Sequence, residues 1–140
     1  MSKILSGVTP LLQVFDMPNA VRFYRDALGF EIVSQSPLIR GTQGEYFHLA
    51  MLRLNDVTVM LNTAYDEGQR PAAPDAARIA AHADTALFFG CPDVAETYAR
   101  FRALGVTVQE APTTTGYGMK RFTISDPDGY HLCFQWPATA

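Results

Sequence analysis

The chain reads MPNAVRFYRDALGFEIV at residues 17–33 and DVAETYARFRALGVTVQ at residues 93–109. In both stretches the apolar residues recur at the spacing of an amphipathic helix, and both helices run into the tripeptide ALG. Gly29 and Gly105 are predicted to end them, because glycine enters the left-handed conformation of a helix C-cap without strain. Pro18 suits a first helical turn, and Asp93 suits a helix N-terminus. Alternating residues follow each glycine and predict a strand after each helix.

The flanking segments repeat as well. The first helix is preceded by VTPLLQVF and followed by HLAMLRLND and VTVMLNTAY. The second helix is preceded by DTALFFG and followed by MKRFTISD and YHLCFQW. LND and DPDG are hairpin-turn sequences. Each half is therefore predicted to be a βαβββ module of an α+β fold, although such similarity can also arise by coincidence of α+β patterning. The expected organisation is one domain, 1–140, with modules 8–64 and 84–137 and a linker, 65–83, that forms a short helix around Asp75–Ala81.

Side chains alternate between the two faces of a strand, so each strand presents one face to the helices and one face away from them. Val57, Val59 and Leu61 form an apolar face, and so do Leu132, Phe134 and Trp136. The opposite faces are mixed in polarity. We expect them to converge on a cup that binds a ligand, with solvent exposure as the alternative. The residues expected to line this cup are Thr9, Leu11, Gln13, Met60, Asn62, Asp84, Phe88, His131, Cys133 and Gln135.

Composition excludes several classes of protein. The 140 residues carry a net charge of −3 and no basic stripe, so a nucleic-acid surface is not expected. No apolar stretch approaches the roughly 20 residues of a membrane helix, and the first residues lack a signal-peptide pattern. The expected location is the cytoplasm. Two cysteines, Cys91 and Cys133, are too few for a disulfide framework and are expected to be free thiols.

Three residues are candidates for catalysis. His131 shares a strand face with Cys133 and is expected within reach of Asp84. An Asp–His pair would supply a general base, and a Cys–His pair would supply a thiolate nucleophile. The alternative is an inert, half-exposed histidine beside a turn. Asp84 opens an otherwise apolar strand, and a buried charge without a partner would be costly. Three explanations are open: Asp84 lies at an exposed rim, it pairs with His131, or it binds a cationic ligand.

Other residues have simpler interpretations. His48 is expected to be a hydrogen-bonded structural residue, and His82 a solvated residue of the linker. The loop Thr113–Arg121 holds Tyr117 and Met119, which suit the wall of a ligand groove, with a plain mobile loop as the alternative. A second long loop, Ser34–Phe47, is expected to cover the same cup.

The segment LLQVFDMPNAVRFYRDALGF, the DPDGY turn and the duplicated βαβββ order resemble the vicinal oxygen chelate superfamily, the group of glyoxalases, bleomycin-resistance proteins and extradiol dioxygenases. The resemblance extends over residues 8–137 and implies a curved, cup-shaped mixed sheet with helices outside. In metal-dependent members, four strand positions supply the ligands, usually histidine, glutamate or glutamine. The matching residues here are Thr9, Met60, Asp84 and Cys133.

This set departs from the metal-binding pattern. A catalytic metal needs about three strong ligands, and threonine and methionine are poor ligands for divalent ions. The resemblance then implies the metal-free branch, whose bleomycin-binding members are homodimers that sequester a drug in grooves between partners. The prediction is a cytoplasmic homodimer that binds a small, partly apolar molecule, with no cofactor, no nucleic acid and no membrane partner.

Two alternatives remain open at this point. One is an enzyme, a lyase, isomerase or dioxygenase, that uses a non-standard site of Asp84, His131 and Cys133 with or without a divalent metal. The other is a structural or regulatory module that has no ligand. Whether the dimer exchanges its halves is left open too, because the linker 65–83 is long enough to permit it.

Overall fold

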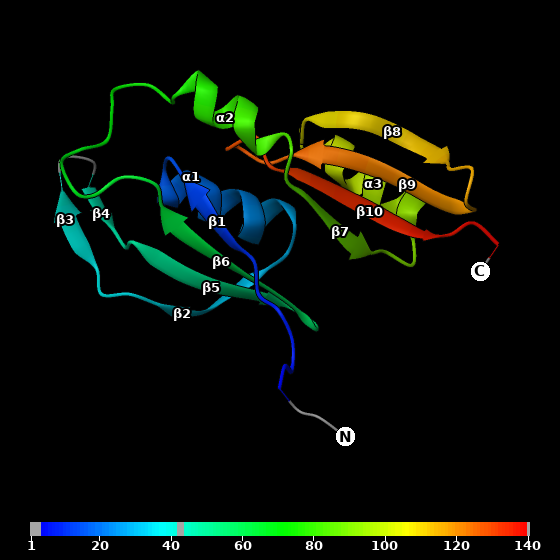
Figure 1. Cartoon of the computed structure of the whole chain (residues 1–140), viewed down its shortest axis with the longest axis horizontal. Coiled ribbons are helices and arrows are strands. Elements are labelled where there is room, and N and C mark those ends of the chain that lie inside the picture. The colour runs from blue at the N-terminus through cyan, green and yellow to red at the C-terminus, as the bar shows by residue number, and fades with distance from the viewer. Residues whose placement is uncertain (1–3, 42–43, 140) are drawn as a thin grey trace. The chain divides into compact units, whose positions relative to one another are not determined.

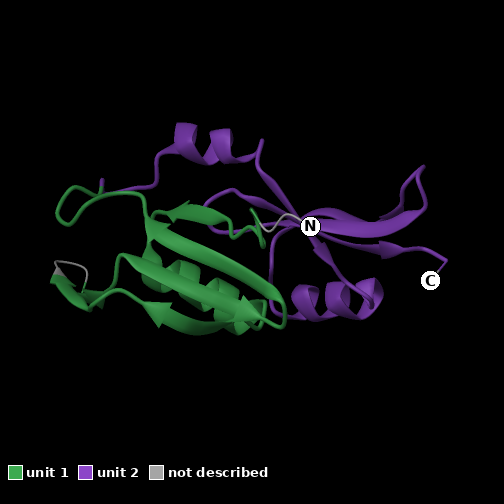
Figure 2. Cartoon of the chain, turned by 60° about the horizontal axis from the view of Figure 1, so that its bottom comes forward, with its two compact units in different colours: residues 1–70 green, residues 71–140 purple. Residues whose placement is uncertain are grey.

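The computed structural model describes residues 4–41 and 44–139. The chain divides into two compact units, Met1–Arg70 and Pro71–Ala140 (Figure 2). Each unit is described by itself below.

The first unit combines one helical segment with a mixed sheet and a small hairpin. Helix α1 continues directly into a π-helical turn, η1, so the two form one rod. The elements are β1 (Leu11–Val14), α1 (Met17–Arg22), η1 (Phe23–Ala27), β2 (Glu31–Gln35), β3 (Ile39–Gly41), β4 (Gly44–Tyr46), β5 (Leu49–Leu54) and β6 (Val57–Thr63).

The second unit starts with the short helix of the predicted linker and then repeats the strand–helix–three-strand order. Its elements are α2 (Ala76–His82), β7 (Ala86–Gly90), α3 (Val94–Ala103), β8 (Val108–Thr114), β9 (Met119–Ser125) and β10 (His131–Pro137).

The main sheets of the two units have the same topology (Figure 1). Their strand orders are β1-β6-β5-β2 and β7-β10-β9-β8. In each sheet the first strand pairs in parallel with the last, and the other neighbours are antiparallel. The predicted duplication of a βαβββ module in an α+β fold is therefore confirmed.

Local sequence signals explain where the helices begin and end. The carboxylate of Asp16 accepts a hydrogen bond from the amide of Asn19 at 3.1 Å, and that of Asp93 accepts one from Glu96 at 3.0 Å. Asp75 caps α2 in the same way. Gly29 and Gly105 have φ of 91° and 76°, the left-handed conformation predicted for both helix ends.

Each unit buries one face of its sheet. In the first, the strand residues Leu12, Val14, Leu52, Val59 and Leu61 are buried, together with Tyr24 of the helical rod. In the second, Phe101 of α3 packs edge-on against Phe122 and Phe134, with ring centroids 5.9 and 5.2 Å apart. Trp136 was expected on this core face. It is instead 37% exposed and lies beside Gly90, at the end of β10 where the core has ended.

Two segments expected to be long loops contain regular structure. The segment Ser34–Phe47 holds the β3–β4 hairpin, in which Ile39 pairs with Tyr46. In Thr113–Arg121, strands β8 and β9 extend inward and leave a tight turn, closed by the amide of Gly118 donating to the carbonyl of Thr115. Both loop assignments were too long, because the alternating residues at their ends join strands.

The linker helix α2 packs on the DPDG turn of its own unit. The His82 ring stacks on Tyr130 at 4.0 Å between centroids, and its Nδ1 donates to the carbonyl of Asp128 at 2.7 Å. A side chain on Gly129 would meet Ile79 at 2.7 Å. The expectation of a solvated His82 is therefore wrong. In the described part of the chain, no helix has the length and apolar character needed to cross a bilayer.

Candidate functional site

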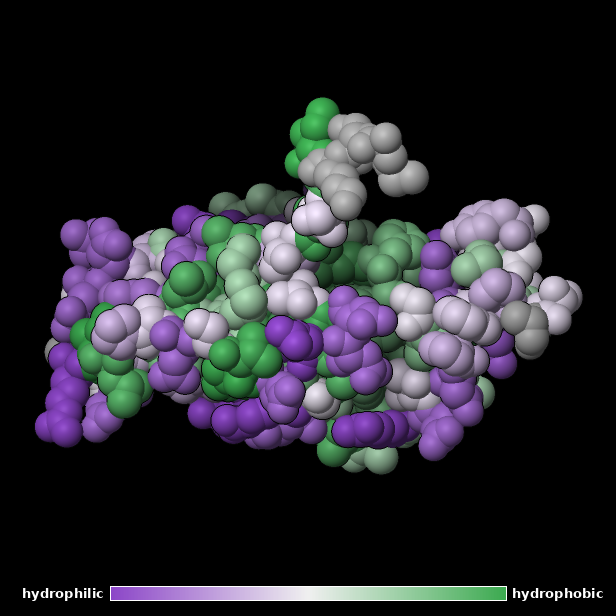
Figure 3. Space-filling model, turned by 90° about the horizontal axis from the view of Figure 1, so that it is seen from below, coloured by the Kyte–Doolittle hydropathy of each residue, from purple (hydrophilic) through white to green (hydrophobic). Residues whose placement is uncertain are grey.

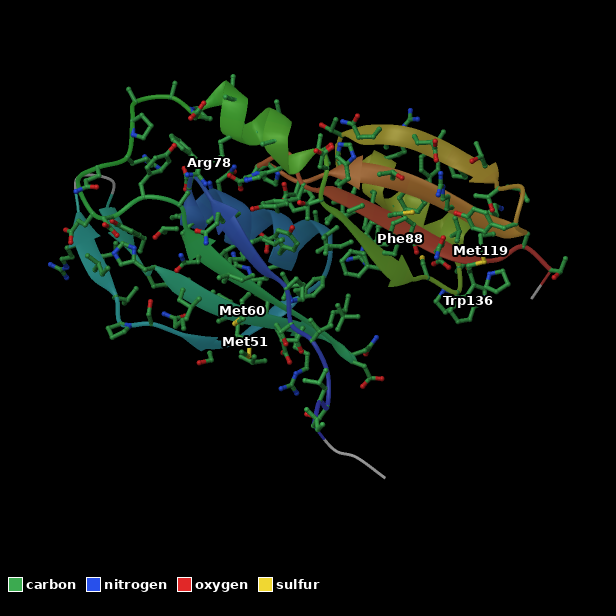
Figure 4. The ribbon with its side chains drawn as sticks, in the orientation of Figure 1. Met51, Met60, Arg78, Phe88, Met119 and Trp136 are labelled. Atoms are coloured by element: carbon green, nitrogen blue, oxygen red, sulfur yellow. The ribbon has the colours of Figure 1, made fainter. Side chains whose placement is uncertain are left out.

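The face of the first sheet that does not enter the core is mixed in polarity, as predicted. Leu11, Met60 and Met51 lie in register on three adjacent strands, β1, β6 and β5. Leu11 is 47% exposed, and both methionines are half-buried. Figure 4 shows Met51 and Met60 close together on the first unit. This apolar row is called the first open face.

A polar row runs beside it. Gln13 is in register with Asn62, whose amide Nδ2 donates to the Gln13 Oε1 at 3.2 Å. Thr9 precedes β1 and is half-buried. The pairing holds two amide groups at fixed positions next to exposed apolar side chains.

The second sheet has a corresponding face, the second open face. Phe88 of β7, Cys133 of β10 and Thr123 of β9 are in register across it. Phe88 is 55% exposed, whereas Cys133 is buried. Figure 4 shows Phe88 and Met119 projecting from this unit. The alternation therefore brings apolar and polar groups together on this sheet as well.

Arg121 and Glu110 form an ion pair at the second open face. The Nε of Arg121 donates to Oε1 of Glu110 at 3.3 Å, and its Nη1 donates to the hydroxyl of Tyr117 at 2.9 Å. Gln135 lies in register with Arg121, and its Oε1 is buried with no hydrogen-bond partner in the described structure. Tyr117 was predicted as a wall residue, but Arg121 and Glu110 were not singled out from the sequence.

The three catalytic candidates, Asp84, His131 and Cys133, are not joined by hydrogen bonds or ion pairs in the described structure. Asp84 is exposed at the start of the second unit's first strand, and its carboxylate forms no ion pair with any described residue. His131 is half-buried, and its ring has no hydrogen bond to the part of the chain that the structure describes. Burial raises the pKa of the Cys133 thiol, while the hydrogen bond with Thr123 and the charge of Arg121 lower it less. The thiol therefore stays protonated at neutral pH, which disfavours a thiolate nucleophile.

The donor chemistry at the four metal-ligand positions does not fit a metal. Within residues 4–41 and 44–139 no three His, Cys, Asp or Glu side chains are grouped as a metal would require. Thr9 and Met60 offer a hydroxyl and a thioether, which bind divalent ions weakly. Cys133 would have to lose a proton that its burial retains.

The remaining histidine and cysteine have structural surroundings. Nδ1 of His48 lies 2.7 Å from the hydroxyl of Thr63, which confirms the prediction of a hydrogen-bonded structural residue. Cys91 is buried and free, as is Cys133. Burial also raises the pKa of the Cys91 thiol.

Two cavities open on the first unit, and none of the predicted site residues lines them. One measures about 430 Å³ and the other about 270 Å³. Both are lined by Met17, Pro18, Arg22 and Tyr46, so they adjoin one another along the start of α1. The sequence carried no signal for them, because their walls come from segments far apart in the chain.

Comparison with known proteins places the fold. TioX from Micromonospora sp. ML1 is similar, with a TM-score of 0.71 and 20% identity over 93% of this chain and 97% of TioX. TnmS3, an antibiotic binding protein from Streptomyces sp. CB03234, has a TM-score of 0.66 and 22% identity over 97% and 99% of the two chains. A bleomycin resistance determinant encoded on the transposon Tn5 has a TM-score of 0.65 and 21% identity over 95% and 98%.

At these identities the structural likeness shows the fold alone. Among curated protein sequences there is no match. The model of the Glyoxalase/Bleomycin resistance protein/Dioxygenase superfamily matches residues 7–134, nearly the whole chain. The chain therefore belongs to the glyoxalase, bleomycin resistance protein and dioxygenase superfamily.

Proposed function

We propose that this protein binds a small, partly apolar molecule on its open sheet faces, without a metal, and that it acts by sequestering that molecule. The observation that carries the proposal is that each open face exposes an apolar side chain, Leu11 on the first face and Phe88 on the second. Leu11 lies beside Met60, and Phe88 beside Cys133. Exposed apolar groups flanked by fixed polar groups are typical of small-molecule sites.

The absence of a metal from the proposed mechanism rests on donor chemistry. Thr9 and Met60 are weak ligands, and the Cys133 thiol retains its proton because burial raises its pKa. Asp84 alone does not hold a divalent ion firmly. The protein would therefore bind its ligand through apolar contact and hydrogen bonds.

The polar groups of the open faces narrow the ligand's chemistry. The amides of Gln13 and Asn62 accept and donate hydrogen bonds on the first face. The chain's net charge of −3 favours the approach of a cationic molecule. Phe88 and Met119 suit an aromatic or otherwise flat apolar group. A cationic aromatic compound matches these features.

Two similar proteins support a role in sequestering a drug. TnmS3 is described as an antibiotic binding protein, and the Tn5-encoded protein as a bleomycin resistance determinant. Bleomycin is therefore the first probe, followed by cationic and aromatic small molecules.

We also propose that the working form is a homodimer in the cytoplasm. Ile4, Leu5 and Val8 are almost fully exposed, and β1, which follows them, is an edge strand. Figure 3 shows apolar side chains of this segment projecting outward next to the grey terminal residues. Exposed apolar residues beside an unpaired strand edge favour association with a second copy.

Fluorescence of Trp136, the single tryptophan, provides the binding assay. Trp136 is part-exposed in β10, the strand that carries Cys133 and Gln135. Titration with the probes in the presence of EDTA is expected to give saturable binding by at least one of them. Phe88→Ala is expected to weaken binding about tenfold, because it removes the exposed aromatic side chain of the second open face.

Leu104→Ala is the matched control, since Leu104 is a similarly exposed apolar residue at the end of α3, away from the open face. Its binding constant is expected to equal that of the unaltered protein. Binding that survives Phe88→Ala unchanged, or a complete lack of binding by the panel, would reject the proposal.

A further inference from the structure

The cavity of about 430 Å³ in the first unit lies apart from the open sheet faces. It is walled by the end of β1, the first turn of α1, strand β4 and residues 63–70. Its volume falls within the roughly 300–1,000 Å³ of sites for small organic ligands. All of its lining residues belong to one unit, so the site is complete in that unit.

Part of the wall of this cavity is aromatic and already fixed in position. Phe15 and Tyr65 pack edge to face, with ring centroids 6.3 Å apart. The Arg70 guanidinium lies over the Phe15 ring at 4.7 Å, donates to the Phe15 carbonyl at 3.4 Å and pairs with Asp16 at 3.7 Å. Arg70 is thus held by three contacts and serves as wall. The pocket is built before any ligand enters.

Two hydrogen-bond donors of the lining form no hydrogen bond with the residues that the structure describes. Tyr46 is only 9% exposed, yet its hydroxyl makes no hydrogen bond with any residue from 4–41 or 44–139. Tyr46 lines both cavities. A polar group on a buried side chain that opens into a cavity is available to a ligand.

Arg22 is the second donor. It lines both cavities and is exposed, and it forms neither a hydrogen bond nor an ion pair with the described residues. The acid one helical turn further on, Asp26, is paired instead with Arg25 at 2.9 Å. The guanidinium therefore keeps its donors free, in the planar arrangement that matches a carboxylate.

We propose that this cavity is a second binding site, for a small aromatic monocarboxylate. The carboxylate would accept hydrogen bonds from Arg22 and the Tyr46 hydroxyl, and the ring would lie against Met17 and Tyr65. Asp16 and Asp66 also line the cavity, and their negative charge disfavours a doubly charged group such as phosphate. A flat aromatic ligand with one carboxylate would bond to both donors and would pack its ring against the apolar part of the wall.

Methyl NMR of protein carrying labelled methionine separates this site from the proposed function. Met17 lines the cavity, whereas Met51, Met60 and Met119 belong to the open faces. With 3-phenylpropionate as the probe, the Met17 resonance is expected to shift saturably, and the resonances of Met51, Met60 and Met119 are expected to stay in place. Phenethylamine, which carries the same ring on a cation, is expected to leave Met17 unshifted at the same concentrations.

Three variants test the donors. Arg22→Gln is expected to weaken phenylpropionate binding about tenfold, because a charged hydrogen-bonding partner is lost. Tyr46→Phe keeps the ring and is expected to weaken it about threefold. Arg100→Gln removes an equal charge from the exposed surface of α3 and should change nothing. Equal response to phenethylamine, an unchanged affinity in Arg22→Gln, or shifts at Met60 in place of Met17 would overturn the proposal.

Discussion

The packing of α2 on the DPDG turn makes a sharp prediction for Gly129→Ala. Gly129 has φ of 87°, and an added Cβ would lie 2.7 Å from both Cγ2 and the carbonyl oxygen of Ile79. The side-chain atom can turn away, but the backbone oxygen cannot, so α2 or the turn must shift. We expect about 1 kcal/mol of cost from the left-handed backbone and about 1–3 kcal/mol from overpacking. The total is about 2–4 kcal/mol.

Gly105→Ala is the matched control for this variant. Gly105 lies in the same unit with φ of 76°, and nothing lies within 4 Å of its added Cβ. It should lose only the backbone cost of about 1 kcal/mol.

Urea unfolding followed by Trp136 fluorescence measures both, because Trp136 belongs to the same unit as the two glycines. With a denaturant dependence of about 2 kcal/mol per molar urea, the midpoint should fall by about 1–2 M for Gly129→Ala and about 0.5 M for Gly105→Ala. Equal shifts in the two variants would refute the packing of Ile79 on the turn.

Three further predictions follow from buried and exposed groups. Burial raises the pKa of Cys133 in the folded protein, so the stability it contributes is complete below the unfolded thiol's pKa and is lost as pH rises above about 8.5. Urea midpoints from pH 7 to 10 should therefore fall less steeply in Cys133→Ala, and parallel pH profiles would contradict this. Asp126 is buried, and its carboxylate accepts hydrogen bonds from two backbone N–H groups of its turn, both at 2.9 Å. Asp126→Ala should therefore lower the free energy of unfolding, measured by thermal unfolding, by about 2–4 kcal/mol. A loss below about 0.5 kcal/mol would show that these hydrogen bonds contribute little. Replacing Ile4 and Leu5 by serine should shift the proposed dimer toward monomer in sedimentation equilibrium, because it removes exposed apolar contact area; a dimer that persists in this variant would show that association uses another surface.

Signals that act over a few residues predicted the architecture well. The glycine stops at Gly29 and Gly105, the cap at Asp93 and the linker helix after Asp75 depend on backbone conformation and adjacent amides, which neighbouring residues determine. The alternation of side chains then assigned Met60 and Cys133 to the faces opposite the core.

Features that depend on distant partners were missed. Nothing near His82 in the sequence indicates that it stacks on Tyr130, 48 positions later. The free donors Arg22 and Tyr46 meet at one cavity only because the β3–β4 hairpin brings β4 to the start of α1. The Arg121–Glu110 pair likewise requires the pairing of β8 with β9.

Metal content tests the central claim of metal-free binding most directly. Purified, untagged protein would be analysed for zinc, nickel and iron before and after loading with each metal and dialysis. The account predicts that the protein retains no metal near one equivalent per chain in either state. Near-stoichiometric metal that disappears in Asp84→Ala would contradict it and would redirect the search toward lyase and dioxygenase substrates.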